Sequence, residues 1–155
     1  MNLTQKHSFK YGFLILVGLI AYFLIMKAIG LEDNLYLRIF NFIIMAGGVW
    51  MAQSTYFKNK ADSFSYFSGL GVGFIASVVA VIGFVIFMSI YIYLIDPSFI
   101  EVMKNSEMWT QDVTPGTAAF AVAIEGIVSG AIISFIGMQY FKSTTFRKKM
   151  NDSDL

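Results

Sequence analysis

Four apolar runs, each long enough to cross a lipid bilayer, constrain the fold of this 155-residue chain more than any other feature. A transmembrane helix needs about 20 predominantly apolar residues. Apolar residues make up 57% of the chain and charged residues 14%, against roughly 45–50% and 25% in soluble domains. Because the apolar excess is concentrated in separate runs, the sequence predicts a helical membrane protein and not a soluble domain.

Signals for helix ends divide these runs into elements. Gly30 is typical of a helix C-terminus, and Asp96-Pro97 and Thr114-Pro115 each place a capping residue before a proline suited to a first helical turn. We predict one integral membrane domain over residues 1–155, with an all-α fold of four transmembrane helices in an up-down bundle. The expected helices cover about 11–29, 35–56, 64–94 and 115–141, with a short amphipathic surface helix at about 97–109 and a flexible tail at 146–155.

Basic residues predict the orientation, because loops on the cytoplasmic side carry an excess of lysine and arginine. The two termini and the middle connection hold eight basic residues, and the other two connections hold three, namely Lys27, Arg38 and Lys104. We therefore expect both termini on the cytoplasmic side, which agrees with an even number of spans. The surface helix then falls on the outer face of the membrane.

The surface helix after Pro97 places apolar residues on one side and charged residues on the other. This pattern is typical of a helix that lies on a membrane surface. A lipid-handling or sensing function through this helix is one hypothesis. The residues expected to face the membrane are Phe99, Ile100, Met103 and Trp109.

Glu125 is the only acidic or basic residue in the last apolar run. A carboxylate at the centre of a membrane helix costs about 2.5–3.5 kcal/mol on insertion scales, so it needs a partner or a function. One interpretation is a protonated acid that hydrogen-bonds to another helix and holds the bundle together. The other is a proton or cation relay in a carrier. Asn41 and Ser129 are the candidate partners at comparable depth.

Small residues recur at every fourth position in the third and fourth predicted spans. Such rows allow helix backbones to approach closely. Packing of the third span on the fourth is the simpler interpretation, and a face for oligomers or a partner is the alternative. The residues are Ser65, Gly69, Gly73 and Ser77 in one row, and Gly126, Gly130 and Ser134 in the other. Gln53 and Gln139 fall near the cytoplasmic boundary, where water can satisfy them.

Residues that support catalysis or metal binding are scarce. The chain has no cysteine and a single histidine, and it contains no serine-hydrolase or zinc-protease motif. We therefore expect neither an enzyme nor a cofactor or metal site. Net charge is +1, which gives no indication of nucleic-acid binding.

Three segments resemble a bacterial family of four-helix membrane proteins called domain of unknown function 4199. They are Ala61–Phe74, Ile95–Met103 and Ala123–Gly130, and the likeness extends from about Lys10 to Lys142. The family is met mainly in Bacteroidetes-type bacteria. The resemblance implies a four-span protein of the bacterial inner (cytoplasmic) membrane, with the surface helix in the periplasm, and it implies no activity.

The function that these patterns favour is a non-enzymatic membrane protein that self-assembles or serves as an accessory subunit of a membrane complex. Its expected partners are the lipid bilayer and either further copies of itself or other membrane subunits. The alternative is a small proton- or cation-coupled carrier or channel that uses Glu125.

Overall fold

The computed structural model describes residues 3–31, 39–59, 65–105 and 113–153, and these segments are helical along almost all of their length. The long helices are α1 (Leu3–Ala28), α2 (Ile39–Asn59), α3 (Tyr66–Ile90) and α5 (Pro115–Ser153). A π-helical turn, η3 (Tyr91–Ile95), continues α3, and the short helix α4 (Phe99–Asn105) follows.

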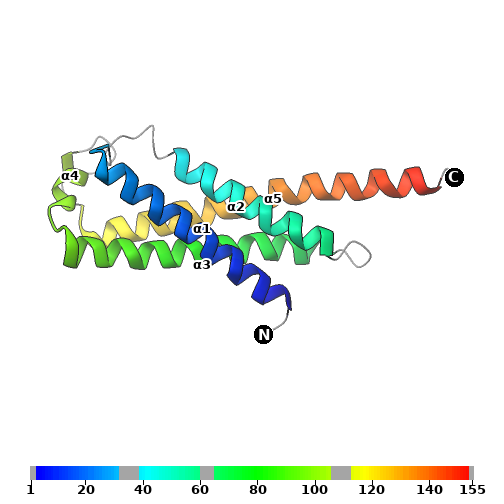
Figure 1. Ribbon diagram of the computed structural model, residues 1–155, viewed down its shortest axis with the longest axis horizontal. Coiled ribbons are helices and arrows are strands. Elements are labelled where there is room, and N and C mark those ends of the chain that lie inside the picture. The colour runs from blue at the N-terminus through cyan, green and yellow to red at the C-terminus, as the bar shows by residue number, and fades with distance from the viewer. Residues whose placement is uncertain (1–2, 32–38, 60–64, 106–112, 154–155) are drawn as a thin grey trace.

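Two helices extend beyond their predicted bounds. Helix α1 begins at Leu3, well before the expected start at residue 11, and α5 continues to Ser153 through the tail expected to be flexible. No glycine or proline lies between Lys142 and Ser153, so neither of the two residues with the lowest helix propensity ends α5 where the apolar run stops. The figures show the end of α5 projecting past the other helices (Figure 1).

Three helices within the described segments are long and apolar enough to cross a membrane: Gln5–Ala28, Tyr66–Ile95 and Pro115–Lys142. Helix α2 is not among them, although its length is sufficient. The polar side chains of Asn41 and Gln53 lower its mean hydropathy. The chain is therefore an all-α protein with three helices of membrane-spanning character and a fourth, less apolar helix packed among them.

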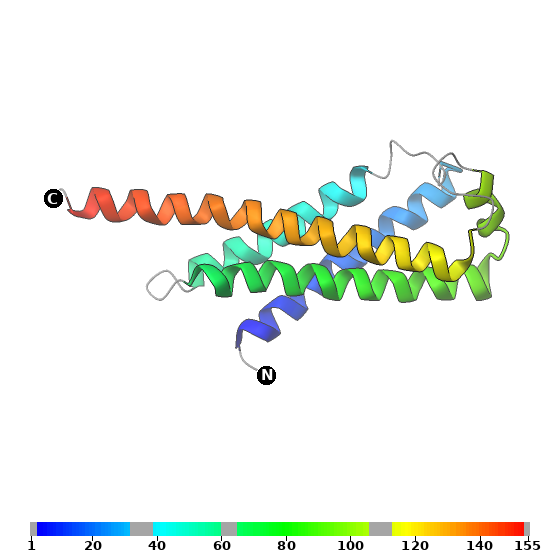
Figure 2. The ribbon, with the colours of Figure 1, turned by 180° about the vertical axis from the view of Figure 1, so that it is seen from behind.

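Helix α3 contacts each of the other long helices, and its contacts with α1 and α5 are the most extensive between any two described elements. Figure 1 and Figure 2 show α5 beside α3 and α1 crossing α3 obliquely. The main core joins α1, α2, α3 and α5 through buried apolar residues that include Ile15, Leu19, Val49, Val72, Ala76, Val81 and Ile133. Most of the other side chains of the three apolar helices are exposed or only partly buried.

The end of α1 and the start of α5 follow the local signals that the sequence contains. Gly30 has a φ of 70° and follows α1, with Gly30 N–H donating to Lys27 O at 3.1 Å and Leu31 N–H donating to Met26 O at 3.0 Å. This is the Schellman pattern, which glycine supports because it lacks a Cβ. At the start of α5, Thr117 N–H donates to Thr114 Oγ1 at 3.2 Å and Thr114 N–H donates to Thr117 Oγ1 at 2.9 Å. These reciprocal bonds form a capping box in which threonine replaces the usual glutamate.

Candidate functional site

The small-residue rows lie where α3 meets α5. A Cβ on Gly126 would lie 2.5 Å from Val81 Cγ2, and one on Gly130 would lie 2.5 Å from Ser77 Cβ. Both distances are far shorter than a carbon–carbon contact, so the absence of a side chain permits the observed spacing. The structure brings together Gly73, Ser77, Gly126, Gly130 and Ser134, and buries Gly69 nearby. Ser65 stands apart as the exposed N-cap of α3.

Gln53 from α2 enters this α3–α5 contact and is only 1% exposed. Its Nε2 donates to the backbone oxygen of Ser134 on α5 at 2.8 Å and lies 3.5 Å from Gly69 O on α3. One side chain therefore connects three helices. The expectation that water satisfies Gln53 at the membrane boundary is wrong, because this amide is enclosed by protein.

Glycines make room for the Gln53 amide. A Cβ on Gly73 would lie 2.6 Å from Gln53 Nε2, and one on Gly137 would overlap Gln53 Oε1. Among the described residues, the buried Oε1 atom and the nearby Ser134 Oγ have no hydrogen-bond partner. Sequence analysis did not select Gln53 or Gly137, although Gly137 follows Ser134 by three positions and so adjoins the row on α5.

Glu125 lies on the exposed side of α5. Val128 and Ile132, one and two turns further along, are 51% and 52% exposed. Ser129 is partly buried, as is Asn41, whose buried Oδ1 has no hydrogen-bond partner within the described parts of the chain. Asn41 Oδ1 therefore accepts no hydrogen bond from Glu125, and the structure does not join these two residues in a relay.

An aromatic cluster links α1, the end of α3 and α4. The Phe23 ring makes edge-on contacts with Tyr91 and Phe99, at centroid distances of 5.1 and 5.7 Å. Phe99 is 6% exposed, so its expected place against the membrane surface is wrong. The rings of Phe23 and Tyr91 enclose Phe99, so its side chain has almost no area left to face a membrane. Ile100 packs partly against the same cluster, whereas the Met103 side chain and all of Trp109 lie outside the described parts of the chain.

An ion pair joins the end of α1 to the segment between η3 and α4. Lys27 Nζ donates to Asp96 Oδ2 at 2.6 Å and lies 5.6 Å from the centre of the Phe99 ring. Asp96 also accepts a hydrogen bond from Ser98 Oγ. The hydrogen bond from Lys27, and then that from Ser98, lower the pKa of the Asp96 carboxyl below its ordinary value. Sequence analysis missed this pair, although both residues adjoin the outer ends of predicted spans.

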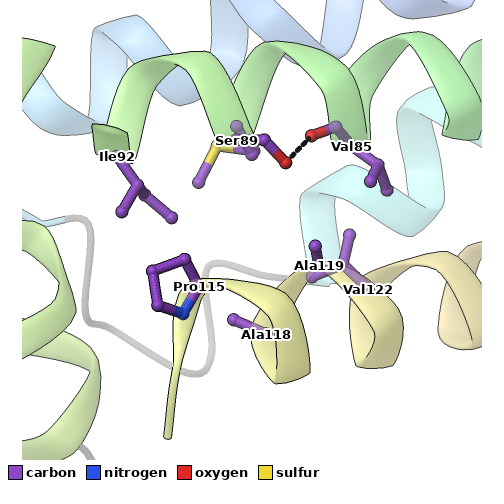
Figure 3. A pocket seen from close by; sticks show the side chains of 8 residues that line it. Val85, Ser89, Ile92, Pro115, Ala118, Ala119 and Val122 are labelled. Atoms are coloured by element: carbon purple, nitrogen blue, oxygen red, sulfur yellow. Dashed lines mark hydrogen bonds between the residues drawn. The ribbon is translucent and has the colours of Figure 1, made fainter. Parts of the chain in front are cut away.

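A small cavity of about 20 Å³ lies between the end of α3 and the start of α5 (Figure 3). Its lining is apolar except for Ser89, whose hydroxyl donates to Val85 O at 2.8 Å. The remaining lining residues are Met88, Ile92, Pro115, Ala118, Ala119 and Val122. Ser89 is therefore the only polar side chain in this lining, and its hydrogen is already committed to Val85 O. The described segments also hold no group of three or more histidine, cysteine, aspartate or glutamate residues that could bind a metal ion.

The fold and these sites define an all-α protein with helices of membrane-spanning character, a polar contact inside its core and an acidic residue on an apolar surface. The chain belongs to the family described as protein of unknown function DUF4199, whose model matches residues 10–143. This match confirms the family resemblance seen in the sequence. The comparisons found no matching curated protein and no matching solved structure.

Proposed function

We propose that this protein is a non-enzymatic integral membrane protein that assembles with further membrane-embedded chains, either copies of itself or the other subunits of a complex. The observation that supports this proposal is the position of Glu125. Its side chain is exposed on the surface of a single copy, inside a helix of membrane-spanning length.

The exposure of Glu125 matters because this residue lies far from the start of α5. At 1.5 Å per residue, Glu125 lies about 15 Å along α5 from its first residue, Pro115. Polar side chains at such depths are expensive in hydrocarbon and usually face protein or a water-filled cavity. A carboxyl group has several hydrogen-bonding positions, so an exposed one can bind a second chain in addition to any contact within its own.

The small-residue rows pack against each other within the molecule, which also supports assembly through another surface. Val81 occupies the space beside Gly126, and Ser77 occupies the space beside Gly130 in the same molecule. The two glycines are therefore not available as a close-packing face for a partner. The outward side of α5, which carries Glu125, stays exposed in the single molecule.

For the membrane arrangement, we propose four spans in an up-down bundle, with α2 crossing the bilayer between α1 and α3. The ends of the helices support this arrangement. The start of α1, the end of α2 and the start of α3 lie toward one end of the molecule, and α4 lies at the other (Figure 1). With the distribution of basic residues, this arrangement favours cytoplasmic termini, a periplasmic α4 and the bacterial inner membrane.

The test compares wild type with Glu125→Gln and Glu125→Leu, each extracted gently and sized by native mass spectrometry. We expect Glu125→Gln to keep the assembly, because an amide also donates and accepts hydrogen bonds. Glu125→Leu should dissociate it while leaving the helical content unchanged. An assembly unaffected by Glu125→Leu would contradict the assigned role of this residue.

A flux assay in vesicles distinguishes the carrier hypothesis. If Glu125 carried protons, Glu125→Gln would abolish proton flux, because an amide does not take up and release protons near neutral pH. The assembly would stay intact. Such a loss of flux would replace assembly with transport as the function of this residue. We expect wild type and Glu125→Gln to give the same passive leak.

A further inference from the structure

We propose that α3 and α5 lie strongly inclined in the bilayer, at about 40° to the membrane normal, while α1 and α2 stand closer to the normal. This inference rests on the membrane arrangement proposed above and deepens it by naming the surface that contacts the hydrocarbon. That surface, here called the α3 stripe, consists of Phe67, Phe74, Ile75, Ile82, Ile86, Ile90 and Leu94.

The α3 stripe is longer than the hydrocarbon core of a bilayer. All of its members are exposed apolar side chains, and its two ends are the most exposed, with Phe67 at 80% and Leu94 at 79%. At 1.5 Å per residue these ends are about 40 Å apart, whereas the hydrocarbon core is about 30 Å thick. No charged residue lies between Tyr66 and Ile95. An upright α3 would therefore push one apolar end out of the hydrocarbon.

Helix α5 repeats this length beside α3. Its apolar part runs from Pro115 to Lys142, which is again about 40 Å along the helix. The Lys142 Nζ atom lies 5.9 Å from the centre of the Tyr66 ring, so α3 and α5 reach one boundary of the apolar region at the same level. The same inclination therefore fits both helices to the hydrocarbon core.

Helices α1 and α2 are shorter between their charged ends. No charged residue lies between Lys10 and Lys27 on α1, and these two are about 25 Å apart along the helix. On α2, the uncharged stretch from Ile39 to Lys58 is about 28 Å long. Both helices cross α3 obliquely and in the same sense (Figure 1 and Figure 2). Their lengths match the hydrocarbon core only if they stand close to the membrane normal.

The Lys27–Asp96 ion pair decides between inclined helices and a thickened bilayer. It joins the end of α1 to the end of η3 at 2.6 Å, so α1 and α3 share one membrane boundary. If α3 stood upright in a bilayer thick enough to cover it, Lys10 would lie about 15 Å inside the other boundary, where a charge is costly. Inclining α3 reduces its depth to about 30 Å and leaves Lys10 at the surface. The inclination is at the upper end of the range for membrane helices.

Depth measurements on spin-labelled single cysteines test the inclination, because the natural chain contains no cysteine. The labels would replace exposed residues: Phe67 and Leu94 at the ends of the α3 stripe, Ile82 at its middle, and Phe9 beside Lys10. In vesicles with a hydrocarbon core of ordinary thickness, collisions with oxygen report hydrocarbon and collisions with a water-soluble nickel chelate report water. The ratio of oxygen to chelate collisions should be several-fold higher at the three stripe positions than at Phe9→Cys.

The alternatives give different patterns. An upright α3 in a bilayer of ordinary thickness would place Phe67→Cys or Leu94→Cys in water. An upright α3 in a locally thickened bilayer would place Phe9→Cys in the hydrocarbon with the stripe positions. Either result would overturn the inclination and leave the proposed assembly intact. Water contact at Ile82→Cys would show that α3 does not cross the bilayer, and the proposed membrane function would fail with the inclination.

Discussion

The Gln53 amide illustrates how a single polar residue organises an apolar core. It gives one good hydrogen bond to Ser134 O at 2.8 Å and keeps an unpaired oxygen beside Gly137. A buried unpaired oxygen lowers the stability of the fold, whereas the hydrogen bond raises it, so the two effects partly cancel. Replacing Gln53 by methionine should therefore change stability little, because it removes the hydrogen bond and the unpaired oxygen together.

The space around Gln53 is a sharper test than its hydrogen bond. In Gly137→Ala, the new Cβ would overlap Gln53 Oε1 and lie 3.3 Å from Gln53 Cδ. Since overpacking typically costs about 1–3 kcal/mol, we expect a loss of that order in the free energy of unfolding. Gln53→Ala should relieve most of this loss in the double variant, as a double-mutant cycle in lipid or mild detergent would show. Additive effects would contradict the contact.

The Lys27–Asp96 ion pair predicts how the end of the molecule near α4 responds to acid. The pKa of Asp96 in the folded protein is lowered, chiefly by the hydrogen bond from Lys27. A lowered pKa means that the folded state favours the ionised form, so the stabilisation is complete above the ordinary Asp pKa of about 3.9. It declines as the pH falls below that value and is gone below the lowered pKa.

Thermal unfolding across this pH range provides the measurement for Asp96. Wild type should be more stable than Asp96→Asn at pH 7, and the two should converge in acid. A difference between the two proteins that stays constant from pH 7 into the acid range would show that the Lys27–Asp96 ion pair does not contribute in this way.

At the scale of elements, the contact between α3 and α5 depends on the lack of side chains at specific glycines. Gly130→Ala should separate the helices, because the added Cβ would lie 2.5 Å from Ser77 Cβ. We expect a destabilisation of about 1–3 kcal/mol. Gly71→Ala is the matched control, since a Cβ there would meet nothing within 4 Å, and alanine favours a helix over glycine. Equal unfolding midpoints for the two variants would refute the close contact.

The elements also show what local sequence can and cannot predict. Gly30 and Thr114 act on their own chain neighbours, so their effects on α1 and α5 could be predicted from sequence. Phe99 could not be placed in this way, because its burial depends on Phe23 and Tyr91 from other elements. The same reason applies to Gln53: hydropathy places it near a helix end, but only the packing of three helices shows that protein covers it.

At the scale of the whole molecule, the position of α2 decides between three and four spans. Single cysteines in the segments 32–38 and 60–64 can be labelled with a maleimide that does not cross membranes. If α2 spans the bilayer, cells should label at 32–38 and stay unlabelled at 60–64. Labelling of both segments from the same side would place α2 outside the hydrocarbon core.

Sequence and structure contribute different parts of the candidate site. Glu125 could be selected from sequence, because one acidic residue in a long apolar run is conspicuous. Its exposure could not, since the sequence left open whether Gly126 and Gly130 pack on the third span or on another chain. The structure settles that orientation through Gly126 and Gly130, which contact Val81 and Ser77. With that side occupied, the acid lies on the outer surface.

The measurement that tests the central claim most directly is native mass spectrometry of the wild-type protein, extracted gently from its own membrane. Assembly with further membrane-embedded chains predicts a defined homo-oligomer or a reproducible complex with other subunits. A monomer without any bound protein would contradict the proposal that this chain functions as an assembling subunit.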